Sequence, residues 1–181
     1  MKNEVDGRRE IASRNTAWAT IIARKLTRWG VTPNQISMMS VFFAMVGCLL
    51  LIGTVIYPDF NKYVAYILFI VCMQSRLLCN LFDGMVAIEG GKKSANGDLY
   101  NDMPDRFADA LFIIPIGYIA GGFGIELGWL AALLAVMTAY FRWIGAYKTH
   151  QHFFNGPMAK QHRMALLTLT FVVATCTIHS G

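Results

Sequence analysis

Most of the acidic side chains lie in one stretch of an otherwise apolar chain. Six of the 11 aspartate and glutamate residues fall between positions 80 and 109, and they are Asp83, Glu89, Asp98, Asp102, Asp105 and Asp109. Carboxylates at this density repel one another unless a positive partner lies among them. The stretch therefore predicts a site that binds cations.

The first half of this stretch predicts a helix face that bears ligands. Asn80, Asp83, Gly84 and Ala87 are spaced three or four residues apart, so a helix brings them onto one side. The small side chains of Gly84 and Ala87 would let a nucleotide or a neighbouring helix come close to the backbone. Helix packing alone explains Gly84 equally well.

The second half predicts another such face. Asp105 and Asp109 are one helical turn apart, and Asn101 joins them if the helix extends back that far. Inside a helix, Pro104 would remove one backbone hydrogen bond and kink the turn. The alternative is that the helix begins near Pro104 and that Asn101 reaches the site from a loop. Two facing helices could supply oxygen ligands to Mg²⁺ or Mn²⁺, which leave coordination positions open for phosphate.

The elements that position these residues are predicted to be membrane helices. The chain has 181 residues, of which 55% are hydrophobic and only 15% are charged, with a net charge of +5 and a mean hydropathy of +0.44. Soluble domains are about one quarter charged. We therefore predict an all-α, polytopic helical membrane protein in contact with the lipid bilayer, and we expect no nucleic-acid partner.

Residues 1–31 are predicted to form a cytoplasmic N-terminal segment with an amphipathic interfacial helix. Within residues 8–29 the basic side chains lie largely off one apolar stripe, which consists of Ile11, Trp18, Ile22, Leu26 and Trp29. Tryptophan beside dense positive charge suits anionic lipid headgroups at a membrane surface. The alternative is an amphipathic helix docked on protein.

Residues 32–181 are predicted to form a transmembrane catalytic domain with five spanning helices. Thr32, Pro33 and Gln35 form a helix start signal of the capping-box type, and the first span runs from there to about Tyr57. The other spans are predicted at about Lys62–Glu89, Asp105–Phe123, Leu127–Tyr147 and Arg163–Ile178. The second of the five is longer than a bilayer core requires, so one of its ends should project into water.

Positive charge predicts the orientation of these spans. With a cytoplasmic N-terminus, the basic residues before Thr32, the loop around Lys92 and Lys93, and the stretch from Arg142 to Arg163 all fall on the cytoplasmic side. We therefore expect the N-terminus and the acidic cluster at the cytoplasmic face, and we expect the membrane to be a bacterial inner membrane.

The spacing of the acidic stretch resembles that of the CDP-alcohol phosphotransferase (CDP-alcohol phosphatidyltransferase) family. The family pattern is D-x-x-D-G-x-x-A-R, eight residues, then G-x-x-x-D-x-x-x-D. The register is kept throughout in this chain, where the motif positions hold Asn80, Asp83, Gly84, Ala87, Ile88, Gly97, Asn101 and Asp105. The segments TPNQIS and NGPMAKQHR also resemble stretches common in the family, so the resemblance covers nearly the whole chain.

The resemblance implies a function. It implies a membrane enzyme that displaces CMP from a CDP-linked donor, usually CDP-diacylglycerol, with a small alcohol as the acceptor and with two divalent ions, Mg²⁺ or Mn²⁺. It also implies a homodimer with six spanning helices in each chain, so we expect this chain of five spans to be truncated at its C-terminus. The sequence does not identify the acceptor alcohol.

Three motif positions depart from the family pattern. Asn80 and Asn101 stand where the family has metal-binding aspartates, and Ile88 stands where it has arginine. Each asparagine removes a negative charge and should weaken metal binding, although an amide oxygen still coordinates a hard cation. Asp109 and Glu89 lie close enough in sequence to restore part of that charge. The asparagine pattern resembles that of a divergent bacterial subgroup of the family, which favours an active enzyme.

The resemblance also implies residue roles. Asp83 is expected to bind metal and the donor diphosphate, with Asn80 and Asn101 as weaker metal ligands. Asp105 is expected to bind metal and to be the base that takes the proton of the alcohol. Asp109 is an alternative ligand or base, or else a carboxylate placed near a helix N-terminus by the helix dipole. Contacts with the nucleotide are expected from Asp83, Gly84, Ala87 and Gly97.

Four basic residues flank the predicted site, namely Lys92, Lys93, Lys160 and Arg163. They could hold the diphosphate or the lipid headgroup. Anchoring of a cytoplasmic loop explains Lys92 and Lys93 without any role in catalysis. Lys160 and Arg163 are favoured as ligands because they lie in the segment that resembles the family.

Two other functions stay open from the sequence. Acidic residues within spans also mark ion pathways, so a cation transporter is one alternative. A transporter would place polar groups along both halves of the membrane, whereas the outer halves of the predicted spans hold almost none. The second alternative is a catalytically inactive member of the family.

Overall fold

The computed structural model describes residues 16–89, 97–149 and 160–180, with side chains throughout except at 97–102, 142, 143, 146–149, 160, 161, 179 and 180. Its helices are α1 (Ala17–Arg28), α2 (Pro33–Ile56), α3 (Lys62–Glu89), α4 (Gly97–Ala120), α5 (Gly124–Thr149) and α6 (Lys160–Ser180). No strand occurs among the described residues. The prediction of an all-α chain is confirmed.

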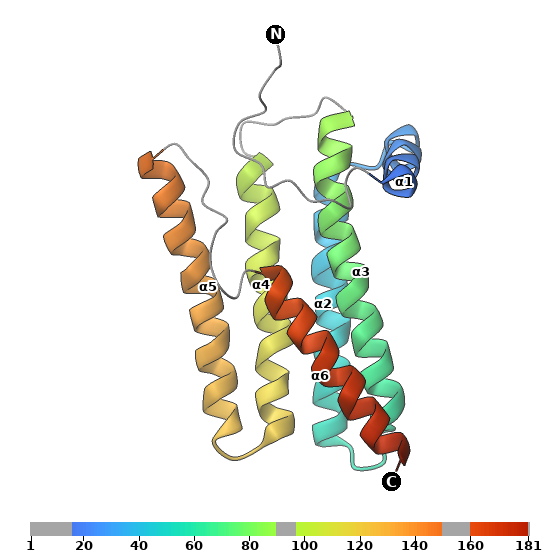
Figure 1. Cartoon of the computed structure of the whole chain (residues 1–181), viewed down its shortest axis with the longest axis vertical. Coiled ribbons are helices and arrows are strands. Elements are labelled where there is room, and N and C mark those ends of the chain that lie inside the picture. Colours follow the sequence, from blue (N-terminus) through green and yellow to red (C-terminus); the bar gives the residue numbers. More distant parts are fainter. Residues whose placement is uncertain (1–15, 90–96, 150–159, 181) are drawn as a thin grey trace.

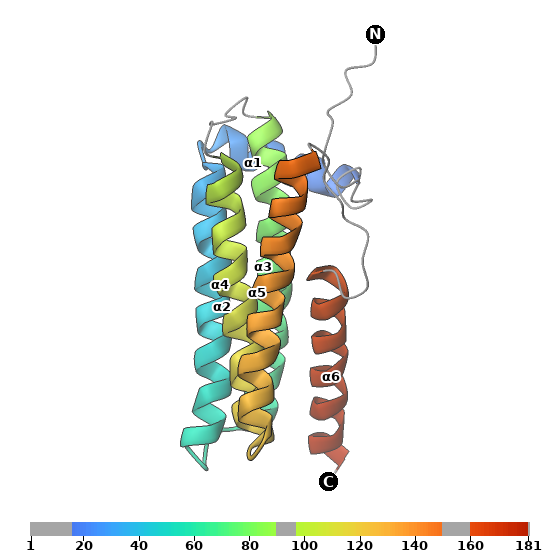
Figure 2. The same ribbon diagram turned by 90° about the vertical axis from the view of Figure 1, so that its left-hand side faces the viewer.

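The helices α2 to α6 run along the long axis of the molecule, and α1 lies across one end of them (Figures 1 and 2). Within the described ranges, three segments are long and apolar enough to cross a membrane, namely α2, α3 and the part of α5 from Gly124 to Phe141. A shorter apolar segment, His162–Ile178, lies within α6. The protein is therefore a polytopic helical membrane protein, as predicted.

The start of α2 has the cap that the sequence predicts. The Thr32 hydroxyl oxygen accepts a hydrogen bond of 3.3 Å from the backbone N–H of Gln35, and the Gln35 side chain accepts one of 2.9 Å from the backbone N–H of Thr32. Pro33 occupies the first helical position, where no backbone donor is needed. Local chemistry alone thus fixes where this helix begins.

The helix α4 begins earlier than predicted. We expected a start near Asp105, but α4 starts at Gly97 and contains Pro104 in its interior. Position 101 therefore lies on the helix and not on a loop. A proline in a helix removes the bond to one carbonyl and leaves the helical dihedral angles accessible, so the chain can remain helical across it at a cost of about 3 kcal/mol.

The helix α1 contacts the bundle through alanines. Ala19 and Ala23 are fully buried and pack with apolar side chains of α3. Trp18 and Trp29, which belong to the predicted apolar stripe, are 46% and 67% exposed. The stripe thus lies partly outside the protein contact, and its insertion into lipid stays a prediction. Ile11 lies outside the described residues.

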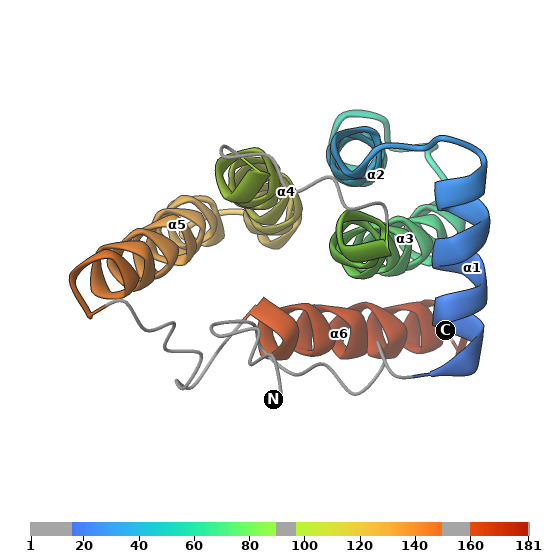
Figure 3. The same ribbon diagram turned by 90° about the horizontal axis from the view of Figure 1, so that it is seen from above.

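The main core of the bundle joins four helices. Phe69 of α3 packs against Phe112 of α4 and Phe171 of α6, with ring centroids 5.4 Å and 4.5 Å apart. Ala44 and Leu51 of α2 belong to the same cluster and are fully buried. Seen from above, α3 lies between α2 and α6 (Figure 3). This core holds α3 in place within the bundle.

Glycines set the spacing of α4 and α5. A Cβ atom added at Gly117 would lie 2.5 Å from the carbonyl oxygen of Gly124 and 3.0 Å from the Cα of Gly128. Both distances are too short for a methyl group against backbone. The two backbones therefore approach as closely as in other small-residue contacts between membrane helices.

We predict that Gly117→Ala lowers the thermal unfolding midpoint of the detergent-purified protein, because overpacking of a close contact costs about 1–3 kcal/mol. Tryptophan fluorescence during heating measures the midpoint. Gly145→Ala on α5 is the matched control, since a Cβ added there meets nothing within 4 Å. Equal midpoints for the two variants would contradict the prediction.

Candidate active site

A buried arginine on α3 connects two acidic residues of α4. The Arg76 side chain is 0% exposed, and its Nη2 donates to Asp109 Oδ1 at 2.8 Å and to Asp105 Oδ1 at 3.1 Å. The same nitrogen donates to the main-chain oxygen of Asp105 at 3.2 Å. The structure therefore brings the two predicted α4 carboxylates together, and it does so through a residue that the sequence did not single out.

Asp109 is held between two arginines. Its Oδ2 accepts a bond of 2.7 Å from Nη2 of Arg163 on α6, and its side chain is 2% exposed. Three helices thus contribute to a cluster of two arginines and two aspartates, whose formal charges cancel. Asp109 lies 12 residues after Gly97, about three turns into α4. The helix dipole acts on the first turn, so it does not explain the presence of Asp109.

Asp83 is a further carboxylate of the site, and it is buried. Its side chain lies in the interior, and its Oδ2 accepts a hydrogen bond of 3.0 Å from the hydroxyl of Ser37 on α2. Arg76, Asn80 and Asp83 follow one another at intervals of four and three residues, so they share a face of α3. The carboxylate of Asp83 and the guanidinium group of Arg76, which contacts Asp105, therefore lie on the same side of α3.

Small or apolar residues surround Asp83 on α3. Gly84 is buried and Ala87 is half-buried, whereas Ile88, at the position of the family arginine, is 54% exposed. Glu89 makes an ion pair with Arg24 of α1, at 3.6 Å between Oε1 and Nε. Glu89 therefore pairs with α1, and no contact between Glu89 and the cluster on α4 is seen among the described residues.

Several predicted site residues cannot be placed by their side chains. Lys92 and Lys93 lie outside the described residues. Gly97, Asn101 and Lys160 lie on helices, with Gly97 and Lys160 as the first residues of α4 and α6, but the side chains of Asn101 and Lys160 are not described.

The side-chain oxygens at this site are of the chemical kind that hard divalent cations prefer. Among the residues with described side chains, no group of three or more His, Cys, Asp or Glu side chains is arranged to hold a metal ion. Mg²⁺, however, is usually bound by only one or two carboxylates, with water and substrate phosphates as the other ligands. Asp83 and Asp105 supply carboxylates of this kind, and Asn80 supplies an amide oxygen.

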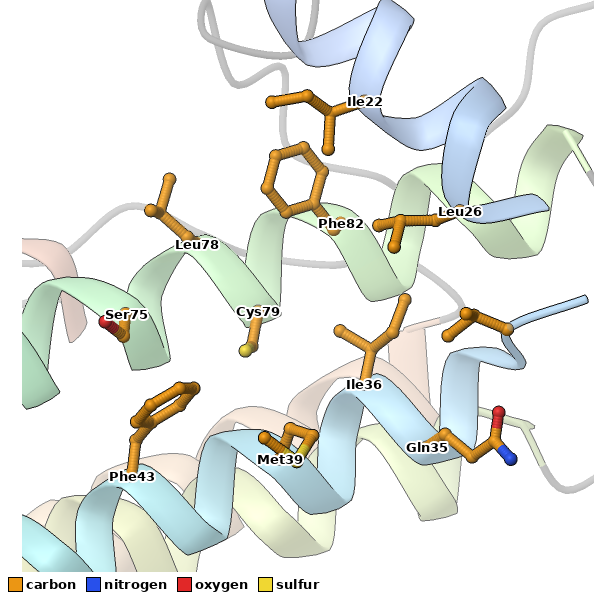
Figure 4. A pocket seen from close by; sticks show the side chains of 11 residues that line it. Ile22, Leu26, Gln35, Ile36, Met39, Phe43, Ser75, Leu78, Cys79 and Phe82 are labelled. Atoms are coloured by element: carbon orange, nitrogen blue, oxygen red, sulfur yellow. The ribbon is translucent and has the colours of Figure 1, made fainter. Parts of the chain in front are cut away.

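An apolar pocket of about 410 Å³ lies between α1, α2 and α3 (Figure 4). Its walls include Ile22 and Leu26 of α1, Phe43 of α2 and Phe82 of α3, whose side chains point toward one another. Phe82 is the neighbour of Asp83 in sequence, so the pocket lies beside the polar site. The end of α3 and the beginning of α4 are at the same end of the bundle as α1 (Figure 1).

Sequence reasoning missed Arg76 and Ser37. Arg76 is the only charged residue between Lys62 and Asp83, in a run that is otherwise uncharged and mostly apolar. A charged residue inside a predicted span is costly unless it is paired, which makes it a functional candidate. That signal could have identified Arg76. No comparable signal marks Ser37, because a serine on an apolar helix is common.

No curated protein sequence matches the chain. A family model described as CDP-alcohol phosphatidyltransferase matches residues 30–180. The matched range takes in α2 to α6 and all of the site residues placed above. The chain therefore belongs to the CDP-alcohol phosphatidyltransferase family.

Proposed function

We propose that this protein transfers a phosphatidyl group from CDP-diacylglycerol to a small alcohol and releases CMP. The family has the general reaction type of transfer from a CDP-alcohol to an alcohol acceptor. The observation that carries the proposal is the set of buried or largely buried carboxylates on α3 and α4, with Asp83 and Asp105 on helices joined by Arg76. Buried acids of this kind are expensive to maintain in a membrane protein and therefore indicate function.

The pocket beside the site supports a lipid donor. It is lined almost entirely by apolar side chains and lies between helices of a membrane protein. Acyl chains match such a surface, while the diphosphate of the same molecule would extend toward Asp83. We propose that the pocket holds an acyl chain of CDP-diacylglycerol.

In the proposed reaction, the hydroxyl oxygen of the alcohol bonds to the phosphorus that carries diacylglycerol. The bond from this phosphorus to the bridging oxygen of the diphosphate breaks, and that oxygen leaves with its electron pair as part of CMP. Asp105 takes the proton of the hydroxyl group. Its side chain is only 13% exposed, so bulk water competes poorly for that position.

The residues proposed to hold Mg²⁺ or Mn²⁺ are Asp83, Asn80, Asn101 and Asp105. When bound, the metal neutralises negative charge on the phosphoryl oxygens and on the departing CMP. Two ions are expected from the family resemblance. The hydroxyl of Ser37 keeps Asp83 oriented, since it donates to one of the two carboxylate oxygens.

We expect the purified protein to release CMP from CDP-diacylglycerol when an acceptor is present, and to stop when EDTA removes divalent cations. Mixed micelles with CDP-diacylglycerol, Mn²⁺ or Mg²⁺ and a panel of alcohols (glycerol 3-phosphate, inositol 1-phosphate, serine and choline) give the assay. Restoring either metal should restore release. Release that survives EDTA would contradict the proposed metal role, and no release with any alcohol would favour an inactive family member.

A further inference from the structure

Arg76 carries more contacts to one residue than an ion pair needs. Its Nη2 reaches both the side-chain Oδ1 and the main-chain oxygen of Asp105, at 3.1 Å and 3.2 Å. A single donor that contacts the backbone and the carboxylate of the same residue restricts the rotation of that side chain. The orientation of Asp105 is thus coupled to the position of the guanidinium group.

The guanidinium group is itself fixed by Asp109. The bond from Nη2 to Asp109 Oδ1 is the shortest of the Arg76 contacts, at 2.8 Å, and the other oxygen of Asp109 is bonded to Arg163. Both oxygens of Asp109 are therefore occupied by arginines. A carboxylate used in this way neutralises buried charge, and it is a poor candidate for a metal ligand or a base.

The other two nitrogens of the Arg76 guanidinium group leave its hydrogen-bonding capacity largely unused. Within the described part of the chain, its Nε and Nη1 are buried and have no hydrogen-bond partner. Leaving two donors unpaired costs free energy, and replacing a buried ion pair with apolar residues is often neutral or stabilising. Stability alone thus gives little reason for an arginine at this position.

We propose that Arg76 is a positioning residue that holds the Asp105 carboxylate for the transfer reaction, with Asp109 and Arg163 as its anchor. The proposal rests on the proposed function, in which Asp105 takes the proton of the alcohol. It assigns Asp109 the role of a counter-ion. It also places a fixed positive charge in a site where asparagine occupies positions 80 and 101.

The test compares Arg76→Met, Asp109→Leu and the double variant Arg76→Met/Asp109→Leu in the CMP-release assay and in thermal unfolding. Each single variant leaves the cluster of two arginines and two aspartates with an unbalanced charge, so its unfolding midpoint should fall. The double variant removes one charge of each sign and keeps Asp105 and Arg163, so the net charge of the cluster stays zero and its midpoint should lie above that of either single variant. Its kcat should nevertheless stay about 100-fold below wild type, with the KM for CDP-diacylglycerol changed less than threefold, because a misplaced reacting group lowers the rate and not the binding.

Arg76→Lys gives a second measurement if the double variant fails to fold. Lysine keeps the charge, but its side chain is one bond shorter and its ammonium group does not reach the position of Nη2, so kcat should fall about tenfold with a wild-type midpoint. A purely structural role predicts instead that kcat recovers together with the midpoint in the double variant, or that Arg76→Lys is fully active. Either result, with an active wild type that depends on Asp105, overturns this inference and leaves the proposed function intact. A wild type that releases no CMP overturns both.

Discussion

Asp105→Asn is expected to lower kcat for CMP release by about 10²- to 10⁴-fold, the range that removal of a general base usually produces. Asparagine has nearly the same shape and can still accept a bond from Arg76, so the fold should persist. Its amide cannot take a proton from the alcohol. The measurement is the rate of CMP formation at saturating donor and acceptor, with the unfolding midpoint determined on the same preparation.

Glu126→Gln is the control for this substitution. Glu126 lies in the first turn of α5, at the opposite end of the bundle from the site, so the loss of its charge should leave kcat unchanged (Figure 1). A residual rate in Asp105→Asn above one tenth of wild type would be inconsistent with Asp105 as the base, and so would an equal loss in Glu126→Gln.

Asp83→Asn is expected to abolish metal-dependent turnover, since it removes the charge of a buried metal ligand. Ser37→Ala should have a smaller effect of the same kind, because loss of a group that orients a ligand costs about 10- to 100-fold in metal affinity. In Ser37→Ala, excess Mn²⁺ should restore most of the rate. Titration of the CMP-release rate with Mn²⁺ measures both effects.

Ser40→Ala is the matched control for Ser37→Ala. Ser40 lies nearly one turn further along α2, is also buried, and donates to the main-chain oxygen of Ser37 at 2.7 Å. Its removal should leave the metal requirement unchanged. If Ser37→Ala and Ser40→Ala need the same Mn²⁺ concentration as wild type, the contact between Ser37 and Asp83 has no role in metal binding.

Helix boundaries were predictable where local chemistry determines them. The capping box at Thr32 and the uninterrupted apolar run after Lys62 gave starts that the structure confirms. The start of α4 was wrong because Pro104 is a good first residue for a helix, and nothing local shows that the helix extends seven residues before it. The continuation depends on neighbouring helices, which the sequence does not display.

The sequence indicated the acidic residues of the candidate site but not the residues that contact them. Spacing placed Asp105 and Asp109 on one face, and in the structure both side chains contact Arg76, which had not been predicted. Arg76 precedes Asp105 by 29 residues and Asp109 by 33. Ser37 precedes Asp83 by 46 residues. Helical periodicity relates residues within one turn or two, so it cannot show which helices become neighbours.

The neutral cluster of Arg76, Asp105, Asp109 and Arg163 also bears on how the chain is assembled during synthesis. Asp109 follows Arg76 by 33 residues and Arg163 follows Asp109 by 54, so the ribosome delivers the members of the cluster one after another. An unpaired charge is disfavoured in hydrocarbon, so α3 should not settle fully among lipids before α4 arrives. Arg163 on α6 then completes the charge balance, so we expect the cluster to form only once α6 has emerged.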